Sequence, residues 1–252
     1  MRRASCGRST RTSSRRPRAW TWCTGSRHSV FPGDRNRCLR QETGEAPMLR
    51  VRVDPVRPAP RRLAPAVEAM RQDQVILYPT DTGYAFGCAL SSRKGIGGIR
   101  SLKGFDVRSR KPLSMLVNDL SEFGHYAIMG TSVFRTVRRI LPGPYTIVLE
   151  ASAEVPRDMR NRHGEIGLRM PDSPLCRMLV DLLGEPVVTG SVVSGDEEPE
   201  LEDPDEFERI FRGRIEVLVD GGPMWPEPST ILQADGNELV VSRLGQGPVP
   251  ET

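Results

Sequence analysis

Six short segments combine hydroxyl, glycine and arginine residues in a pattern that suits anion binding. Each lies beside an apolar run of the length of a β-strand. They are Thr80-Asp81-Thr82-Gly83, Gly143-Pro144-Tyr145-Thr146, Arg169-Met170-Pro171, Thr189-Gly190-Ser191, Ser229-Thr230 and Arg243-Leu244-Gly245. Hydroxyl and backbone N–H groups bind phosphate and carboxylate oxygens, and arginine supplies the opposite charge. If these segments converge, they form an anion site large enough for a nucleotide.

A basic loop from Lys103 to Lys111 adds Arg108 and Arg110 to this inventory. Each feature by itself has a simpler explanation, because charged loops are commonly solvated and Ser and Thr commonly form turns. Arg169 could equally pair with a carboxylate at the surface. The six segments together favour the anion site modestly, and their convergence is a hypothesis.

Several other chemistries lack their motifs in this chain. It has no Gly-x-x-x-x-Gly-Lys-Ser/Thr phosphate loop and no Gly-x-Ser-x-Gly nucleophile elbow. His28, His125 and His163 are far apart, and no Cys-x-x-Cys occurs, so we expect no metal site. No apolar run approaches the ~20 residues of a membrane-spanning helix, so no membrane partner is expected.

The elements that position these segments can be predicted from hydrophobic periodicity. We expect strands at 50–54 and 75–78, a second strand that continues through 89–90, and further strands at 113–117, 145–150, 165–171, 186–189, 216–220, 229–232 and 238–243. We expect helices at 61–71, from a serine cap at 91–92 to 102, from 120, and at 131–141, 174–183 and 204–211. Strands and helices mix, and some neighbouring strands are close enough for hairpins. The sequence therefore predicts an α/β domain with a mixed sheet of parallel and antiparallel strands.

Charge divides the chain into two regions. Residues 1–47 carry 11 arginines, no lysine and three acidic residues, a formal charge of +8, whereas residues 48–252 carry 25 basic and 29 acidic residues. Residues 48–252 therefore lack the net positive charge that would let a domain bind nucleic acid over its whole surface. The extension could be a basic nucleic-acid-binding arm, a transit peptide or an upstream segment that is not part of the working protein. We favour the last, with translation starting at Met48 and a single domain at 48–252.

Cysteine usage points to a reducing compartment. Three of the five cysteines lie in the extension, and only Cys88 and Cys176 fall in the body. Two cysteines do not make a disulfide framework, so we expect a reduced, cytoplasmic protein.

The stretch from Tyr78 to Cys88 resembles a family signature. Tyr-Pro-Thr-Asp-Thr-Gly-Tyr-Ala-Phe-Gly-Cys is similar to the Tyr-Pro-Thr-Glu/Asp-Thr-x-Tyr-Gly-Leu-Gly-Cys motif of the YrdC/Sua5/YciO family. The similarity continues through Lys103, Lys111-Pro112-Leu113-Ser114, Pro142 to Thr146, Ile166 to Pro171, Pro228 to Ile231 and Arg243-Leu244-Gly245. It covers roughly residues 50–250 and looks nearest to the YciO branch. It implies a twisted mixed sheet with flanking helices around a basic cavity.

The resemblance also implies an activity. Well-understood members of the family are L-threonylcarbamoyladenylate synthases, which join ATP, L-threonine and bicarbonate and release diphosphate. Their product feeds the t6A modification of tRNA. By resemblance, Thr80 and Lys103 lie at the catalytic centre, and ATP enters with Mg²⁺ as substrate and with no tightly bound cofactor. The residues expected to hold substrate or nucleotide are Arg108, Arg110, Ser114, Thr146, Arg169, Thr189, Ser191, Ser229 and Arg243.

Two motifs depart from the synthase pattern. Synthases carry Lys-x-Arg in the basic loop, where this chain has Lys103-Gly104-Phe105, and Arg108 or Arg110 is the candidate replacement. Synthases also carry Thr-Ser-Ala-Asn-x-Ser-Gly, where this chain has Thr189-Gly190-Ser191-Val192-Val193-Ser194-Gly195. Other family members are described as binders of double-stranded RNA. A non-catalytic module that binds RNA in the same cavity is therefore the alternative prediction.

Overall fold

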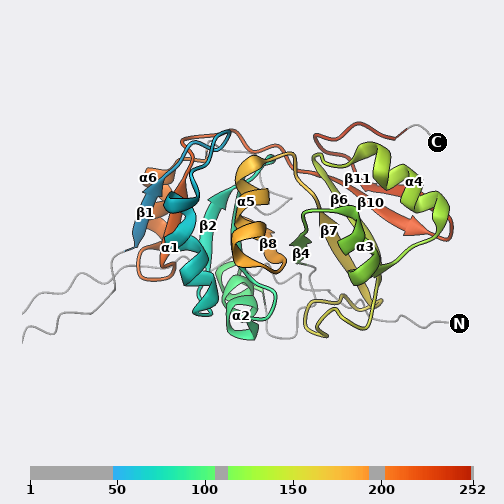
Figure 1. Ribbon diagram of the computed structural model, residues 1–252, viewed down its shortest axis with the longest axis horizontal. Helices are drawn as coiled ribbons and strands as arrows, with labels where there is room; N and C mark the ends of the chain where they lie inside the picture. Colours follow the sequence, from blue (N-terminus) through green and yellow to red (C-terminus); the bar gives the residue numbers. More distant parts are fainter. Residues whose placement is uncertain (1–47, 106–112, 193–201, 251–252) are drawn as a thin grey trace, which may run out of the picture. The chain divides into compact units, whose positions relative to one another are not determined.

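An eleven-stranded mixed sheet runs through the part of the chain that the computed structural model describes, residues 48–105, 113–192 and 202–250 (Figure 1). The strand order is β1 (Leu49–Arg52), β9 (Val217–Asp220), β2 (Ile76–Pro79), β3 (Tyr84–Ala89), β8 (Val187–Ser191), β4 (Ser114–Leu116), β7 (Glu165–Arg169), β6 (Tyr145–Ala151), β10 (Thr230–Asp235) and β11 (Glu238–Arg243). The short strand β5 (Ala127–Ile128) pairs with β6 outside this path. The 1–47 extension, Arg108 and Arg110 lie outside the described residues, so the predictions about them stay predictions.

The strand pairing confirms the mixed sheet that the sequence predicts. β9 is parallel to both β1 and β2, β4 is parallel to β7, and β6 is parallel to β10. The pairs β2–β3, β3–β8, β8–β4, β7–β6 and β10–β11 are antiparallel. Strands close in sequence thus form hairpins, and helices connect the more distant ones.

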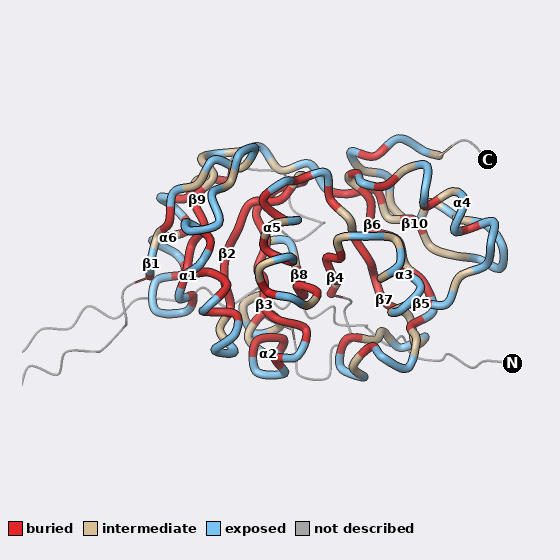
Figure 2. Tube along the Cα trace, viewed as in Figure 1, coloured by how far each residue is buried: buried red, intermediate tan, exposed pale blue. Residues whose placement is uncertain are grey.

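Helices cover the sheet over two apolar clusters (Figure 2). One cluster packs α1 (Pro60–Arg71) and α5 (Pro174–Leu183) against β2 and β9. The other joins the strands to α2 (Arg93–Leu102), α3 (Leu120–Tyr126), α4 (Thr131–Ile140) and α6 (Pro204–Phe211). Burial of both strand faces explains why β2 and β3 are apolar throughout.

Local sequence signals set the helix ends. Ser92 caps α2 by accepting a hydrogen bond from Gly95 N, and Ser173 caps α5 in the same way through Cys176 N. Gly184 ends α5 with a φ of 84°, a conformation that favours glycine. These boundaries agree with the helices predicted at 92–102 and 174–183.

The second strand, predicted to continue through 89–90, is β3. It begins at Tyr84 and ends at Ala89, so Leu90 lies beyond it. The turn residues before Tyr84 and the glycine at position 87 conceal the strand, since glycine usually weakens strand propensity. Here Gly87 is needed, because a Cβ atom on it would lie 2.6 Å from the Tyr78 ring. None of the described helices is long and apolar enough to cross a membrane.

Candidate functional site

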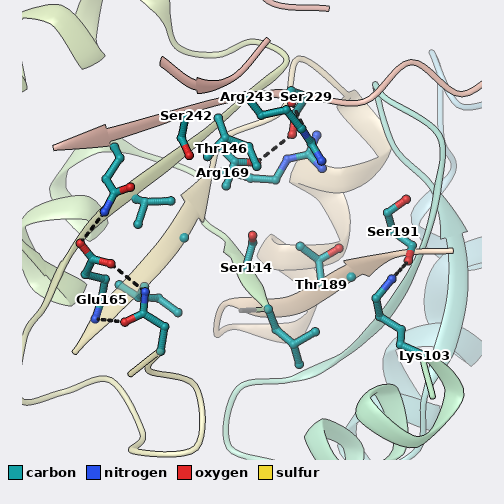
Figure 3. A pocket seen from close by; sticks show the side chains of 18 of the residues that line it. Lys103, Ser114, Thr146, Glu165, Arg169, Thr189, Ser191, Ser229, Ser242 and Arg243 are labelled. Carbon is teal, nitrogen blue, oxygen red and sulfur yellow. Dashed lines mark hydrogen bonds between the residues drawn. The ribbon is translucent and has the colours of Figure 1, made fainter. Parts of the chain in front are cut away.

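A cavity of about 460 Å³ lies over one face of the sheet, where β4, β7, β6 and β10 run side by side (Figure 3). Its floor is a row of paired residues, because Ser114 pairs with Gly167, Gly167 with Val148, and Val148 with Gln233. Residues paired across neighbouring strands point to the same face of a sheet. This register therefore carries one row of side chains across four strands and into one cavity of the volume typical of ligand pockets.

The floor requires glycine at position 167. A Cβ atom there would lie 2.8 Å from Ser114 Oγ and 3.2 Å from Thr146 Cγ2. The bare backbone of Gly167 on β7 leaves room for these two hydroxyl-bearing residues, which lie on the strands to either side, β4 and β6. The Ile166-Gly167-Leu168-Arg169 motif thus shapes the cavity as well as supplying its arginine.

Arg169 and Arg243 form the most basic part of the cavity, which we call the arginine corner. Arg243 donates from Nη2 to the Ser229 carbonyl at 2.7 Å, and the Thr146 and Ser229 hydroxyls lie 2.9 Å apart. The Nε–H groups of both arginines are buried and have no hydrogen-bond partner. Burial, reinforced by the positive charge of Arg169, lowers the pKa of Arg243. An anion bound between them would provide the missing acceptor and offset this repulsion.

The Thr80–Gly83 turn supports Arg169 from behind. Arg169 Nη2 donates to Asp81 Oδ1 at 2.7 Å and to Thr82 Oγ1 at 2.8 Å. Burial raises the pKa of the Asp81 carboxyl, although the guanidinium of Arg169 opposes that shift. The turn therefore fixes one side of the Arg169 guanidinium, and its Nε–H keeps no partner.

Thr80 does not line the cavity. Its hydroxyl donates to the Gly83 carbonyl at 2.6 Å and accepts from Thr82 N at 3.1 Å. The hydroxyl therefore acts as both donor and acceptor within the turn. Gly83 has a φ of 128°, which closes the turn and favours glycine. The catalytic role predicted for Thr80 stays a prediction, and its observed position is structural.

Lys103 enters the cavity from the C-terminal end of α2. Its ammonium group donates to the Ser191 carbonyl at the end of β8 and lies 5.6 Å from the centre of the Phe105 ring. Two residues earlier on β8, the Thr189 hydroxyl accepts a hydrogen bond of 2.9 Å from the buried Tyr78 hydroxyl. The two altered motifs, around Lys103 and Ser191, therefore meet at one edge of the cavity.

Eight of the residues predicted from the sequence line this one cavity. They are Lys103, Ser114, Thr146, Arg169, Thr189, Ser191, Ser229 and Arg243. The sequence reasoning missed four polar lining residues, Asn161, Glu165, Gln233 and Ser242. The period of two along β7 could have found Glu165, because it lies two residues before Gly167 and four before Arg169. Among the described residues, no three His, Cys, Asp or Glu side chains gather as metal ligands would.

Known proteins share both the sequence pattern and the fold. The family model Sua5_yciO_yrdC, described as "Telomere recombination", matches residues 68–245. "Uncharacterized protein YciO" of Escherichia coli K12 is 30% identical over 198 residues, covering 78% of this chain and 95% of that protein. Threonylcarbamoyl-AMP synthase of Bos taurus is 28% identical over 163 residues, covering 64% of this chain and 57% of that one.

Two solved structures agree with the architecture. The crystal structure of E. coli YciO matches with a TM-score of 0.74 and 29% identity, covering 80% of this chain and 97% of that one. P. abyssi Sua5 complexed with L-threonine matches with a TM-score of 0.69 over 79% of this chain and 57% of that one. At 24% identity, the match to P. abyssi Sua5 supports a shared fold only. The resemblance first read from the Tyr78–Cys88 signature is thus confirmed, and this chain belongs to the Sua5/YciO/YrdC family.

Proposed function

We propose that this chain binds ATP in the cavity and forms threonylcarbamoyl-AMP from ATP, L-threonine and bicarbonate, with release of diphosphate. One observation carries the proposal: the buried Arg169 and the half-buried Arg243, whose Nε–H groups have no hydrogen-bond partner, line one cavity together with Thr146 and Ser229. Unpaired buried donors are costly, and an anionic ligand offsets that cost. Family relatives with the name threonylcarbamoyl-AMP synthase identify the reaction to be tested.

The chemistry needs positioning and charge more than a protein nucleophile. The amine of threonine adds to bicarbonate with loss of water and gives a carbamate. A carbamate oxygen then attacks the α-phosphorus of ATP, and the bond to the β,γ-diphosphate breaks. The arginine corner would hold phosphate oxygens, and Lys103 would stabilise charge that develops between carbamate and phosphate.

Magnesium is part of the proposed substrate. Mg²⁺ commonly enters a site with ATP, bound to phosphate oxygens and water and few protein ligands. The product would be consumed by the t6A modification of tRNA, and a cytoplasmic location remains our prediction.

The test is a turnover assay on the full chain with ATP, L-threonine and labelled bicarbonate. The proposal expects diphosphate release that depends on threonine, together with labelled threonylcarbamoyl-AMP. Lys103→Ala should abolish turnover while the melting temperature stays close to that of the unchanged protein.

The alternative function gives the opposite pattern in the same samples. A non-catalytic RNA-binding module would release no diphosphate and would bind duplex RNA with an affinity that falls steeply with salt. That result would reject the synthase proposal.

A further inference from the structure

The carboxylate of Glu165 lies at the opposite end of β7 from the arginine corner. Figure 3 shows Glu165 on the cavity wall, and Asn161 and Gln233 line the same cavity. The proposed chemistry at the phosphates uses none of these three side chains. A carboxylate in a basic cavity needs its own explanation, since it weakens anion binding unless it contacts another part of the ligand.

Two amides hold this carboxylate in place. Asn161 Nδ2 donates to Glu165 Oε2 at 2.7 Å, and Gln233 Nε2 donates to Glu165 Oε1 at 2.9 Å. Asn161 is itself fixed, because its Oδ1 accepts from the Glu165 and His163 backbone N–H groups at 2.9 and 2.8 Å. Each carboxylate oxygen can accept more than one hydrogen bond. The two amides therefore hold the Glu165 carboxylate in one orientation, and its oxygens can still accept further hydrogen bonds.

The space beside Glu165 is large enough for a ligand group. A second cavity of about 550 Å³ borders the first and shares Glu165, Gln233 and Ser242 with it. Its remaining lining comes from β10 and β11. The three shared residues thus lie between the two cavities. An elongated ligand bound at the arginine corner can extend past them into the second cavity.

The separation of the two ends fits a nucleotide. Arg169 and Glu165 are four residues apart on one strand, which at about 3.3 Å per residue corresponds to roughly 13 Å. A nucleoside monophosphate has a comparable length from its phosphate to the far edge of its base. An amino acid is too short to reach both ends.

We propose that Glu165, oriented by Asn161 and Gln233, accepts a hydrogen bond from the exocyclic amino group of the nucleobase. This inference rests on the proposed function, in which the arginine corner holds the phosphates. An ionised carboxylate only accepts hydrogen bonds, so it favours a base edge that donates and disfavours one that presents a carbonyl oxygen. Glu165 is thereby a specificity residue for adenine.

The test compares ATP with purine riboside triphosphate, which lacks the 6-amino group, by calorimetry on the full chain. The unchanged protein should bind ATP about tenfold more tightly, the size expected for a hydrogen bond to a charged group. ITP, which carries a carbonyl at that position, should bind more weakly still. In Glu165→Ala the preference for ATP over both analogues should disappear.

Glu150→Gln is the matched control. Glu150 pairs with Glu165 across β6 and β7 but is exposed and does not line the cavity. It tests whether any nearby negative charge produces the effect, and it should keep the full preference for ATP.

The outcomes separate this inference from the proposed function. Equal affinity of the unchanged protein for ATP and its deamino analogue would overturn the role of Glu165 while leaving ATP binding in place. Failure of every triphosphate to bind would overturn both. The wild-type comparison remains decisive even if Glu165→Ala does not fold.

Discussion

The Thr80–Gly83 turn and the arginine corner contain the same kinds of polar groups, but they use them differently. In the turn, the Thr80 hydroxyl bonds to Gly83 and Thr82, and Thr82 and Asp81 bond to Arg169. In the corner, Arg169 and Arg243 each keep a buried Nε–H without a partner. Asp81 Oδ2 is also buried without a partner, but Asp81 does not line the cavity, whereas both arginines do. Unmet donors on residues that line a cavity can be satisfied by a ligand. We therefore assign support to the turn and binding to the corner.

Arg169→Met should have the largest effect, because Arg169 belongs to both regions. It would remove an anion donor from the cavity and leave the buried Asp81 carboxylate uncompensated. Loss of one partner of a buried ion pair typically costs about 3–5 kcal/mol of unfolding free energy. Urea denaturation would measure this loss, and calorimetry would show weaker ATP binding.

A double variant separates these two contributions. Adding Asp81→Asn to Arg169→Met removes the uncompensated charge, so we expect much of the stability to return while ATP binding stays weak. Recovery of ATP affinity in the double variant would show that Arg169 acts only as a structural partner of Asp81.

Thr80→Val tests the supporting role of the turn. Valine has a similar shape but cannot accept from the Thr82 N–H, which would lose its acceptor, while the Gly83 carbonyl keeps its hydrogen bond from the Thr80 backbone N–H. We expect the unfolding free energy to fall by about 1–3 kcal/mol and the Kd for ATP to change little. If the stability is unchanged and turnover is lost, Thr80 acts in catalysis, as the sequence resemblance implies.

Glu202 provides a smaller test at the end of the turn. Its Oε2 accepts the Tyr84 N–H, its Oε1 has no partner, and burial raises its pKa from 4.5 to about 7. Because the folded-state pKa is the higher one, the stability that the protonated group contributes is complete below pH 4.5 and is lost as the pH rises through 7.

Glu202→Gln should remove this pH dependence. The amide carbonyl can still accept the Tyr84 N–H without carrying a charge. We expect the melting temperature at pH 8 to rise by a few degrees, at about 2–4 °C per kcal/mol for a domain of this size, with little change at pH 4. Identical slopes of melting temperature against pH for both proteins would contradict the assignment.

Much of the fold could be predicted from the sequence, because its signals are local. The serine before α2, the glycine after α5 and the apolar period of the strands each specify an element within a few residues. β3 was predicted poorly, since its glycine is required by contact with Tyr78, a residue on the neighbouring strand. Such a requirement is invisible until the strands are paired.

Residue types in the sequence were enough to predict which hydroxyl and arginine side chains gather at one cavity. They did not show which of these groups are already used by neighbouring residues. Arg169, Arg243, Thr146 and Ser229 line one cavity as the hypothesis of convergence requires. Thr80 carries the same chemistry, but its hydroxyl is used within its own turn. Glu165 was missed because a carboxylate does not fit a search for anion-binding residues, and its framing amides come from a loop and a distant strand.

Calorimetric titration of the full chain with Mg²⁺–ATP, beside the Arg243→Met variant, tests whether the arginine corner binds phosphate. Arg243 makes no ion pair among the described residues, so its replacement should leave the melting temperature nearly unchanged. We expect binding to the unchanged protein and about tenfold to a hundredfold weaker binding to the variant, the cost of losing a charged contact. Equal affinity of the two proteins would contradict the assignment of the arginine corner as the phosphate site.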